Sequence, residues 1–441
     1  MRRSGTLWEV LRLPRPQRYL WELADDLCSG RSVVLFLPGH VAAEDVILAV
    51  EEHCRDRARM ESVYVSRSAR WPEEWLMERF HVEGDPWADT ALEAIRRAPG
   101  LPPILILRDL DSLPDEVLAQ WSRLIADWAA HNRRPDLSPS ERKAIFAVVS
   151  EPRAVGVLAQ LGDDVFLRKA WYWGWVTSRE LRVVAAEYLR ERHYDEVAQL
   201  WGESVWATLA GADWNCFLWL ARRATVEMPL DQLFELLRAY GRERMPWAGD
   251  DPADDPLLQL DLQESELEAS LISGVGGSFG GSLRVEPASL EPSLDERPLW
   301  LAGLWDWHDE GKRGWHSAAL EVAGRRQSLD HRVWRGQAAV LLPMIDQIRI
   351  ALSELLARRD SSWPEYRDKR EARFGGGHGK TAAELWTIES FLESHTFDPG
   401  LRRLGPTVEA IRLIRNSLAH YRPVEWADFE KVCKIYASMR R

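Results

Sequence analysis

Three polar residues near the C-terminus, Arg415, Asn416 and His420, have the side chains that acid–base cleavage of a phosphodiester requires. Histidine exchanges a proton near neutral pH. Arginine binds phosphate oxygens and stabilises negative charge that develops in a transition state, and asparagine can orient either group. The trio therefore suits cleavage of an RNA backbone through its 2′-hydroxyl without a metal ion. The structural alternative is that Arg415 packs between helices and His420 caps a helix end.

The sequence around the trio predicts one amphipathic helix. Pro406 is suited to begin it and Pro423 to end it. Asn416 and His420, four residues apart, share its polar face, whereas Arg415 and His420 lie about 140° apart around an ideal helix axis. One copy of the motif is therefore an incomplete site. The apolar residues recur at three- and four-residue steps and form one stripe: Val408, Ile411, Ile414 and Leu418.

This Arg-Asn-x3-His pattern resembles the Arg-x4–6-His motif of the HEPN family, small helical bundles that include many RNases of toxin and antiviral systems. The resemblance implies that His420 is the acid/base, Arg415 the phosphate binder and Asn416 the orienting group. It also implies that a dimer pairs two motifs. Further helices are predicted from 331 to about 358, over 382–393 and over 425–438, so residues 299–441 are expected to form a four-helix bundle.

Composition is that of an ordinary soluble globular protein of several domains, with 441 residues, 46% hydrophobic and 29% charged. The four cysteines are far apart and form no Cys-x-x-Cys motif, which argues against a zinc site and for a reducing compartment. No apolar run is long enough to span a membrane, and no signal peptide is visible. We therefore expect a cytoplasmic protein that needs no cofactor or metal and has no membrane partner.

Charge is distributed unevenly along the chain. Residues 331–441 contain 19 Lys and Arg against 14 Asp and Glu, whereas residues 246–298 contain 2 against 12. The acidic segment is rich in glycine and proline, which predicts a linker over 246–298. The basic C-terminal part suits phosphate binding, although a solvated helical surface would have the same balance.

Residues 1–170 alternate between strand-like and helix-like segments. Buried strands are predicted at 32–37, 62–66, 103–107 and 143–149, with helices between them. This alternation indicates a doubly wound parallel sheet, an α/β domain. Residues 171–245 carry repeated apolar stripes at helical spacing and are predicted to be all-α.

The strand that ends at Leu107 is followed by Asp109 and Asp111, and an acidic residue there is the Walker B position of P-loop ATPases. The arrangement resembles the ATPase core of STAND and AAA+ proteins, in which residues 171–245 would be the helical lid or winged-helix part. A P-loop needs glycines, a lysine for the phosphates and a hydroxyl for magnesium. The loop Pro38–Glu44 has neither lysine nor hydroxyl, and Glu44 adds negative charge.

The chain therefore resembles the inactive STAND-like modules of bacterial conflict systems. We expect no ordinary ATP hydrolysis, and Asp109 and Asp111 are interpreted as strand-end caps or relics of a magnesium site. A Gly-Lys-Thr in Phe374–Thr381 lacks the first P-loop glycine and a preceding strand, so it is interpreted as a loop. His308 and His316 beside Asp306 and Asp309 match no common metal motif, and the tryptophans around them predict a packed bundle edge or a partner-binding patch.

Three functional hypotheses follow. The first is a regulatory or adaptor component of an antiphage (conflict) system that binds a protein partner and assembles through its C-terminal bundle. The second is a metal-independent endoribonuclease, active as a homodimer on RNA through Arg415, Asn416 and His420. The third is an ATP-dependent switch, against which the Pro38–Glu44 loop argues.

Overall fold

The computed structural model describes residues 7–65, 71–82, 90–245, 291–307, 313–373 and 383–440. The chain divides into two compact units. The first comprises Met1–Leu181, Gly211–Asn215 and Tyr240–Ala319, and the second Arg182–Ala210, Cys216–Ala239 and Leu320–Arg441. The expected division at residues 170, 245 and 298 stays a prediction, and residues 246–290 of the expected linker lie outside the described residues.

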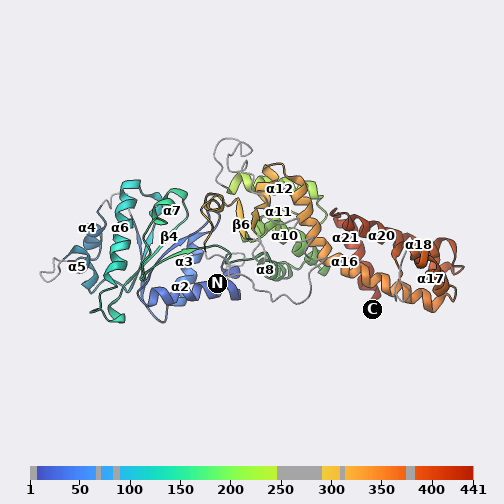
Figure 1. Cartoon of the computed structure of the whole chain (residues 1–441), viewed down its shortest axis with the longest axis horizontal. Coiled ribbons are helices and arrows are strands. Elements are labelled where there is room, and N and C mark those ends of the chain that lie inside the picture. Colours follow the sequence, from blue (N-terminus) through green and yellow to red (C-terminus); the bar gives the residue numbers. More distant parts are fainter. Residues whose placement is uncertain are drawn as a thin grey trace. The chain divides into compact units, whose positions relative to one another are not determined.

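A five-stranded parallel sheet forms the centre of the first unit, in the order β2-β3-β4-β1-β5 (Figure 1). Every residue of β1 and β4 is buried, as expected for central strands covered on both faces. The predicted combination of an α/β part and an all-α part is confirmed. The strands are β1 (Ser32–Phe36), β2 (Met60–Tyr64), β3 (Ile104–Arg108), β4 (Ala144–Val149) and β5 (Leu167–Trp171).

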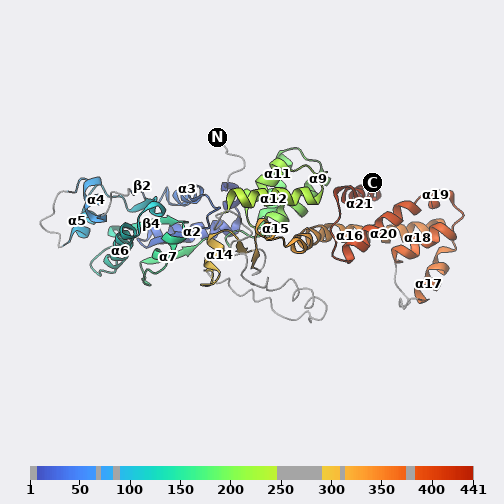
Figure 2. The same ribbon diagram turned by 90° about the horizontal axis from the view of Figure 1, so that it is seen from above.

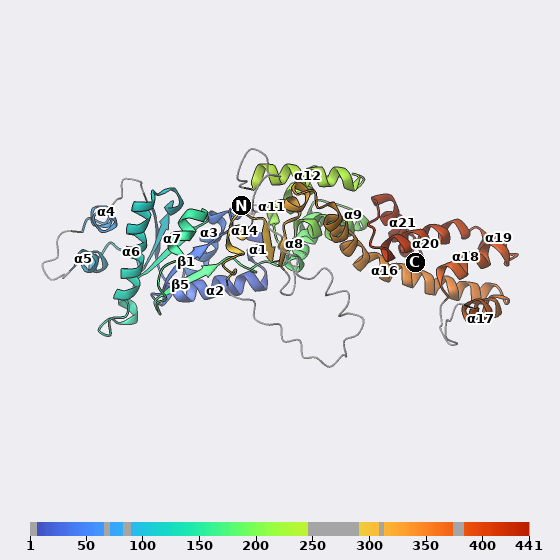
Figure 3. The same cartoon turned by 45° about the horizontal axis from the view of Figure 1, so that its top comes forward.

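Helices cover both faces of this sheet (Figure 3). On one face, α2 (Pro14–Cys28) and α3 (Ala43–Cys54) pack together and contact β4. On the other, α6 (Asp115–His131) packs with α7 (Pro152–Leu158) and also contacts β4. This division follows from right-handed crossovers, because the β1-to-β2 and β3-to-β4 connections run in opposite directions across the sheet. Shorter elements are α1 (Trp8–Leu11), α4 (Pro72–Arg79), α5 (Ala91–Arg97), α14 (Arg297–Leu301), β6 (Trp305–Trp307) and β7 (Arg313–Trp315).

The second unit is helical in its described part (Figure 2). Its longest helix, α16 (Arg326–Arg359), contains Pro343 without ending there and packs with α17, α18, α20 and α21, while α18 also packs on α20. No helix of the described ranges is long and apolar enough to cross a membrane. The loop Phe374–Thr381 lies outside the described residues. The C-terminal helices are α17 (Trp363–Arg373), α18 (Leu385–Ser394), α19 (Pro399–Arg402), α20 (Gly405–Ala419) and α21 (Trp426–Met439).

A π-helical turn (Gly202–Trp206) in the second unit is contacted closely by α16. A Cβ atom added to Gly336 of α16 would lie 1.9 Å from the carbonyl oxygen of Ser204 and 2.7 Å from the hydroxyl of Thr208. Only a glycine therefore allows these two backbones to approach as they do.

Candidate functional site

The helix α20 carries the predicted motif. It runs from Gly405 to Ala419 with Pro406 in its first turn, close to the predicted start. The four residues of the apolar stripe, Val408, Ile411, Ile414 and Leu418, are all buried. The sequence periodicity therefore identified both the helix and the face that packs inward.

Two side chains of α16 hold the C-terminal end of α20 in place. The indole N–H of Trp334 donates to the carbonyl oxygen of Leu418 at 2.5 Å. The fully buried amide of Gln337 donates to the carbonyl of Val424 at 2.7 Å and accepts from its N–H at 2.8 Å. Because buried polar groups need such partners, these bonds fix the turn that follows α20.

That turn closes the helix at His420. The N–H of Arg422 donates to the carbonyl of Ser417 at 3.0 Å and that of Tyr421 to Leu418 at 3.3 Å, the paired bonds of a Schellman motif. Tyr421 takes the left-handed position, with φ +58°, which costs a non-glycine residue about 1 kcal/mol. Its ring packs edge-on against Trp334 at 4.7 Å between centroids. His420 is thus an exposed C-cap residue.

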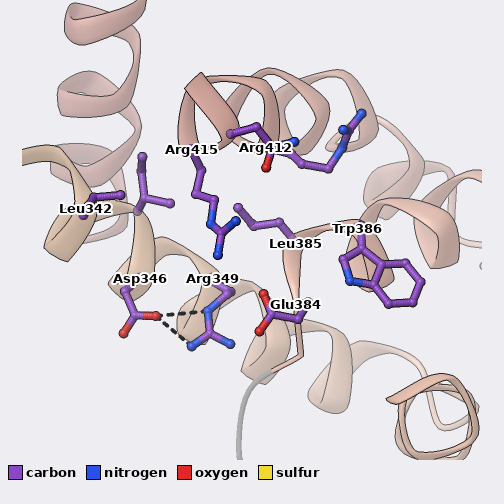
Figure 4. Close-up of a pocket in the computed structure, with 10 residues that line it drawn as sticks. Leu342, Asp346, Arg349, Glu384, Leu385, Trp386, Arg412 and Arg415 are labelled. Carbon is purple, nitrogen blue, oxygen red and sulfur yellow. Dashed lines mark hydrogen bonds and ion pairs between the residues drawn. The ribbon is translucent and has the colours of Figure 1, made fainter. Parts of the chain in front are cut away.

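Arg415 and Asn416 line a pocket of about 400 Å³ between α20, α16 and the start of α18. The Arg415 side chain points into this space toward Asp346 and Arg349 (Figure 4). The remaining lining residues are Leu342, Ile345, Glu384, Leu385, Trp386 and Arg412.

The arginines of this pocket differ in their partners. Arg349 pairs with Asp346 at 2.7 Å, and Arg412 pairs with Glu389 of α18. Arg415 makes no hydrogen bond or ion pair with any residue that the structure describes. Since a guanidinium has five N–H donors, Arg415 is the pocket group available to an anionic ligand such as phosphate.

His420 is not among the residues that line this pocket. The structure thus brings Arg415 and Asn416 together and places His420 at the helix end. This agrees with their angular separation on an ideal helix. One chain therefore does not assemble all three groups of the predicted trio around this pocket.

The second candidate site is the loop after β1, where a P-loop would bind phosphate. The N–H of Gly39 donates to the carbonyl of Leu301 at 3.1 Å, and Asn215 donates to the carbonyl of His40 at 3.0 Å. The His40 ring lies against Gly303, where an added Cβ would be 2.9 Å from Nδ1. The Gly39 N–H, a donor of the kind that a P-loop turns toward phosphate, is therefore engaged here within the protein.

The groups at the ends of the neighbouring strands are also engaged. Arg108 bonds to Glu44 and donates to the Ser62 hydroxyl at 3.0 Å. Asp111 accepts from the N–H and hydroxyl of Ser150, both at 3.0 Å, and from the N–H of Glu151 at 3.2 Å. The prediction of a capping role is confirmed for Asp111.

Asp109 differs from Asp111 in that its side chain makes no cap bond. It has φ +65° and begins the short 3₁₀ turn Leu110–Ser112 without a side-chain cap bond. Its backbone carbonyl accepts from the N–H of Ser112 at 3.1 Å and from the Ser112 hydroxyl at 2.9 Å. Of the two interpretations given for Asp109, a strand-end cap or a relic of a magnesium site, the structure does not show the first, and the second stays a prediction.

A buried polar cluster near this loop was missed by sequence reasoning. Asp213 accepts from the hydroxyl of Tyr240 at 2.5 Å, and His316 Nε2 lies 3.4 Å from the same carboxylate oxygen. All three residues are at most 2% exposed. Burial alone would raise the pKa of Asp213, but the nearby His40 and His316 and the Tyr240 hydrogen bond hold it well below its ordinary value. No spacing in the sequence connects these residues, so no local pattern could have identified them.

Within the described ranges, no group of three or more His, Cys, Asp and Glu side chains is arranged to hold a metal ion. Of the residues considered for a metal, His308 and Asp309 lie outside the described residues, and His316 belongs to the Asp213 cluster. The tryptophans of this segment with described side chains, Trp300, Trp305 and Trp315, are buried. They contribute to packing within the first unit, where Trp300 lies edge-on to Trp171 of β5.

Comparison of the sequence with models of known protein families and with curated proteins gives no match.

Proposed function

We propose that this chain is a regulatory or adaptor component of a bacterial antiphage (conflict) system. Its first unit would be a P-loop NTPase-like, STAND-like fold that has lost ATP hydrolysis. Its C-terminal helices would form a HEPN-like four-helix bundle for assembly or output. The antiphage setting rests on the resemblance of the sequence to those families.

The observation that carries this proposal is the engaged loop after β1. Its Gly39 N–H is bonded to Leu301, and no lysine follows. Glu44, at the start of α3, is bonded to Arg108 and adds negative charge where phosphates would lie. A triphosphate entering here would meet the charge of Glu44 and a Gly39 N–H that is already bonded, which disfavours ATP as the trigger.

The decisive experiment separates an adaptor from an ATP-driven switch. Cells that carry the gene for this chain together with its neighbouring genes are challenged with phage. They are compared with cells in which the gene is deleted and with cells that carry the Asp109→Asn variant. Asparagine tolerates the left-handed backbone of position 109, so this variant removes charge without strain. We expect loss of protection on deletion and full protection with Asp109→Asn. Protection lost with Asp109→Asn, in a protein of unchanged melting temperature, would contradict the proposal.

Purified protein gives the matching biochemical test. Tight ATP binding would stabilise the folded protein by roughly 2.7 kcal/mol at a ligand concentration of one hundred times Kd. This stabilisation would raise the melting temperature. We expect no shift with ATP and magnesium and no release of phosphate. A nucleotide-dependent shift would support the switch instead.

A second function, a metal-independent endoribonuclease, is favoured by the Arg415 guanidinium in the pocket beside Asn416. In this reaction His420 of a second copy would take the 2′-hydroxyl proton. The 2′-oxygen would attack phosphorus, and the 5′-oxygen would leave with the proton that the histidine gives back. Arg415 would stabilise the phosphorane charge.

RNA cleavage in EDTA tests this function, with wild type beside Arg415→Ala, His420→Ala and the control Arg403→Ala. Arg403 is exposed and lies outside the pocket lining. We expect cleavage by wild type and control only, together with a dimer in sedimentation. Cleavage that survives His420→Ala, or cleavage by a strict monomer, would refute the ribonuclease. Loss of cleavage alone would leave the adaptor proposal untouched.

A further inference from the structure

The strand β5 is an edge of the parallel sheet. It pairs with β1 on one side and with no strand of the described residues on the other (Figure 3). The N–H of Tyr172 donates to the carbonyl of Phe36 in β1 at 2.9 Å. Because alternate residues of a parallel strand bond to the same neighbour, the backbone groups of Lys169 and Trp171 point away from β1. They make no hydrogen bond with any residue that the structure describes, so β5 presents the kind of edge to which another extended chain can add.

A cavity of about 800 Å³, here called the edge groove, follows this strand. Every residue of β5, from Leu167 to Trp171, lines it. Tyr19 of α2 and Ala159, which directly follows α7, also line it, and these two helices cover opposite faces of the sheet. The groove therefore lies beside the edge itself, between the two helical layers. Since five residues of strand extend over roughly 17 Å, its course suits an extended chain rather than a compact ligand.

Basic side chains on β5 indicate which kind of chain would pair with it. Arg168 is held by Glu22 and Asp26 of α2. Lys169, the next residue along the strand, pairs with Asp163 at 3.0 Å, and the Asp163 side chain is 98% exposed. An ion pair with so exposed a partner contributes little to stability. The Lys169 ammonium can therefore exchange Asp163 for a carboxylate of an incoming chain.

A second cation lies at the other end of the edge groove. The guanidinium of Arg297 lies over the Trp171 ring, 4.6 Å from its centroid, and pairs at 3.2 Å with the exposed carboxylate of Glu291. An antiparallel second copy of β5 would instead bring its own Arg168 and Lys169 against the same two cations. Because like charges opposite each other destabilise a strand pair, the charges favour an acidic chain over a second copy.

We propose that β5 is the docking edge for an extended acidic segment of a partner protein. The segment adds to the sheet as a sixth strand through the backbone of Lys169 and Trp171, and its carboxylates lie at Lys169 and Arg297. Backbone hydrogen bonds supply the affinity of such a complex, and side chains on alternate faces of the added strand supply its specificity. The inference rests on the proposed adaptor function for the existence of a protein partner. Its test measures peptide binding alone, so a failure there would leave the phage-protection result unaffected.

The test exposes the purified full chain to a library of random linear peptides and identifies the sequences that are retained. We expect acidic sequences without internal proline, because proline cannot donate to a strand ladder. The most enriched peptide is then synthesised with a fluorescent label, and its affinity is measured by anisotropy. Hydrogen exchange should show that the amides of Lys169 and Trp171 become protected when this peptide binds.

Charge reversal at the groove gives the decisive variant. Lys169→Glu places a like charge opposite the peptide carboxylate and should weaken binding about tenfold. The matched control is Arg123→Glu, which reverses a charge on an exposed residue of α6 outside the groove and should leave the affinity unchanged. Lys169→Pro removes a donor that β1 does not use, and it should abolish binding. If the proline variant does not fold, Lys169→Glu and the exchange data decide without it.

Several results would overturn the proposal. They are a library without enriched sequences, enrichment of basic peptides, and peptides that bind Lys169→Glu as tightly as wild type. Protection of the Lys169 and Trp171 amides in the free monomer would show that another part of this chain already covers the edge. Protection that appears only as the protein concentration rises would assign the edge to a second copy.

Discussion

Asp111 accepts two hydrogen bonds from Ser150, one from its backbone N–H and one from its hydroxyl, both at 3.0 Å. The Asp111 carboxylate, which follows β3, therefore binds the turn that leads from β4 into α7. A Walker B carboxylate would instead face magnesium and phosphate. The Asp111 carboxylate therefore has a structural role in this chain.

Replacing Asp111 by alanine is expected to destabilise the first unit by about 1 to 3 kcal/mol, because the Ser150 and Glu151 donors lose their acceptor. Chemical denaturation followed by tryptophan fluorescence measures this change. Asp109→Asn serves as the control and should stay within about 0.5 kcal/mol of wild type. Equal losses in both variants would show that charge at this edge, and not the cap, is responsible.

Gly336→Ala should destabilise the second unit strongly. The added Cβ would lie 1.9 Å from the backbone oxygen of Ser204, and backbone cannot move aside as a flexible side chain does. Overpacking of this kind costs typically 1 to 3 kcal/mol. The matched control is Gly405→Ala in α20, where nothing lies within 4 Å of the new atom. A Gly336→Ala protein as stable as the control would mean that α16 and the π-helical turn are not in this contact.

The local features of the fold could be predicted from the sequence, and α20 shows why. Its apolar stripe repeats within a single helix, so the periodicity that buries Ile411 and Leu418 is visible in a few turns. The same periodicity predicted that Arg415 and His420 diverge. The pocket opposite Arg415 could not be predicted, because Asp346 and Arg349 reach it from a helix far away in the chain.

Two other features were hidden for different reasons. The strand β5 was missed because Arg168 and Lys169 interrupt its apolar run, although its backbone pairs with β1 throughout. The Asp213 cluster depends on residues separated by long stretches of sequence. Such tertiary contacts leave no spacing that one sequence can reveal, whereas the missing P-loop lysine is visible directly.

Arg415→Ala should weaken RNA binding without changing stability. Arg415 has no hydrogen-bond or ion-pair partner among the described residues, so its removal should cost less than about 0.5 kcal/mol in unfolding. If it contacts phosphate, the affinity for single-stranded RNA should fall about tenfold. The slope of log K against log salt should also become less steep, by the amount expected for the loss of about one phosphate contact. Fluorescence anisotropy at several salt concentrations measures both quantities, with Arg403→Ala as control. Unchanged affinity and slope would remove Arg415 from any phosphate-binding role.

Acid should destabilise the first unit through Asp213. The folded state holds the pKa of this carboxyl below its ordinary value, which is about 3.9 in an unfolded chain. Its stabilising contribution is therefore fully present above about pH 4 and is lost as pH falls from there toward the folded-state pKa. Denaturant unfolding between pH 7 and 3 measures this, and Asp213→Asn should show a shallower acid dependence than wild type.

Tyr240→Phe separates the hydrogen bond from the charge of Asp213. It removes the 2.5 Å bond but keeps His316 beside the carboxylate, so it should cost about 1.5 to 3 kcal/mol at neutral pH. Because the carboxylate is then less favoured, the loss of stability below pH 4 should also become smaller. A Tyr240→Phe protein with the full acid dependence of wild type would show that the histidines alone hold the Asp213 pKa down.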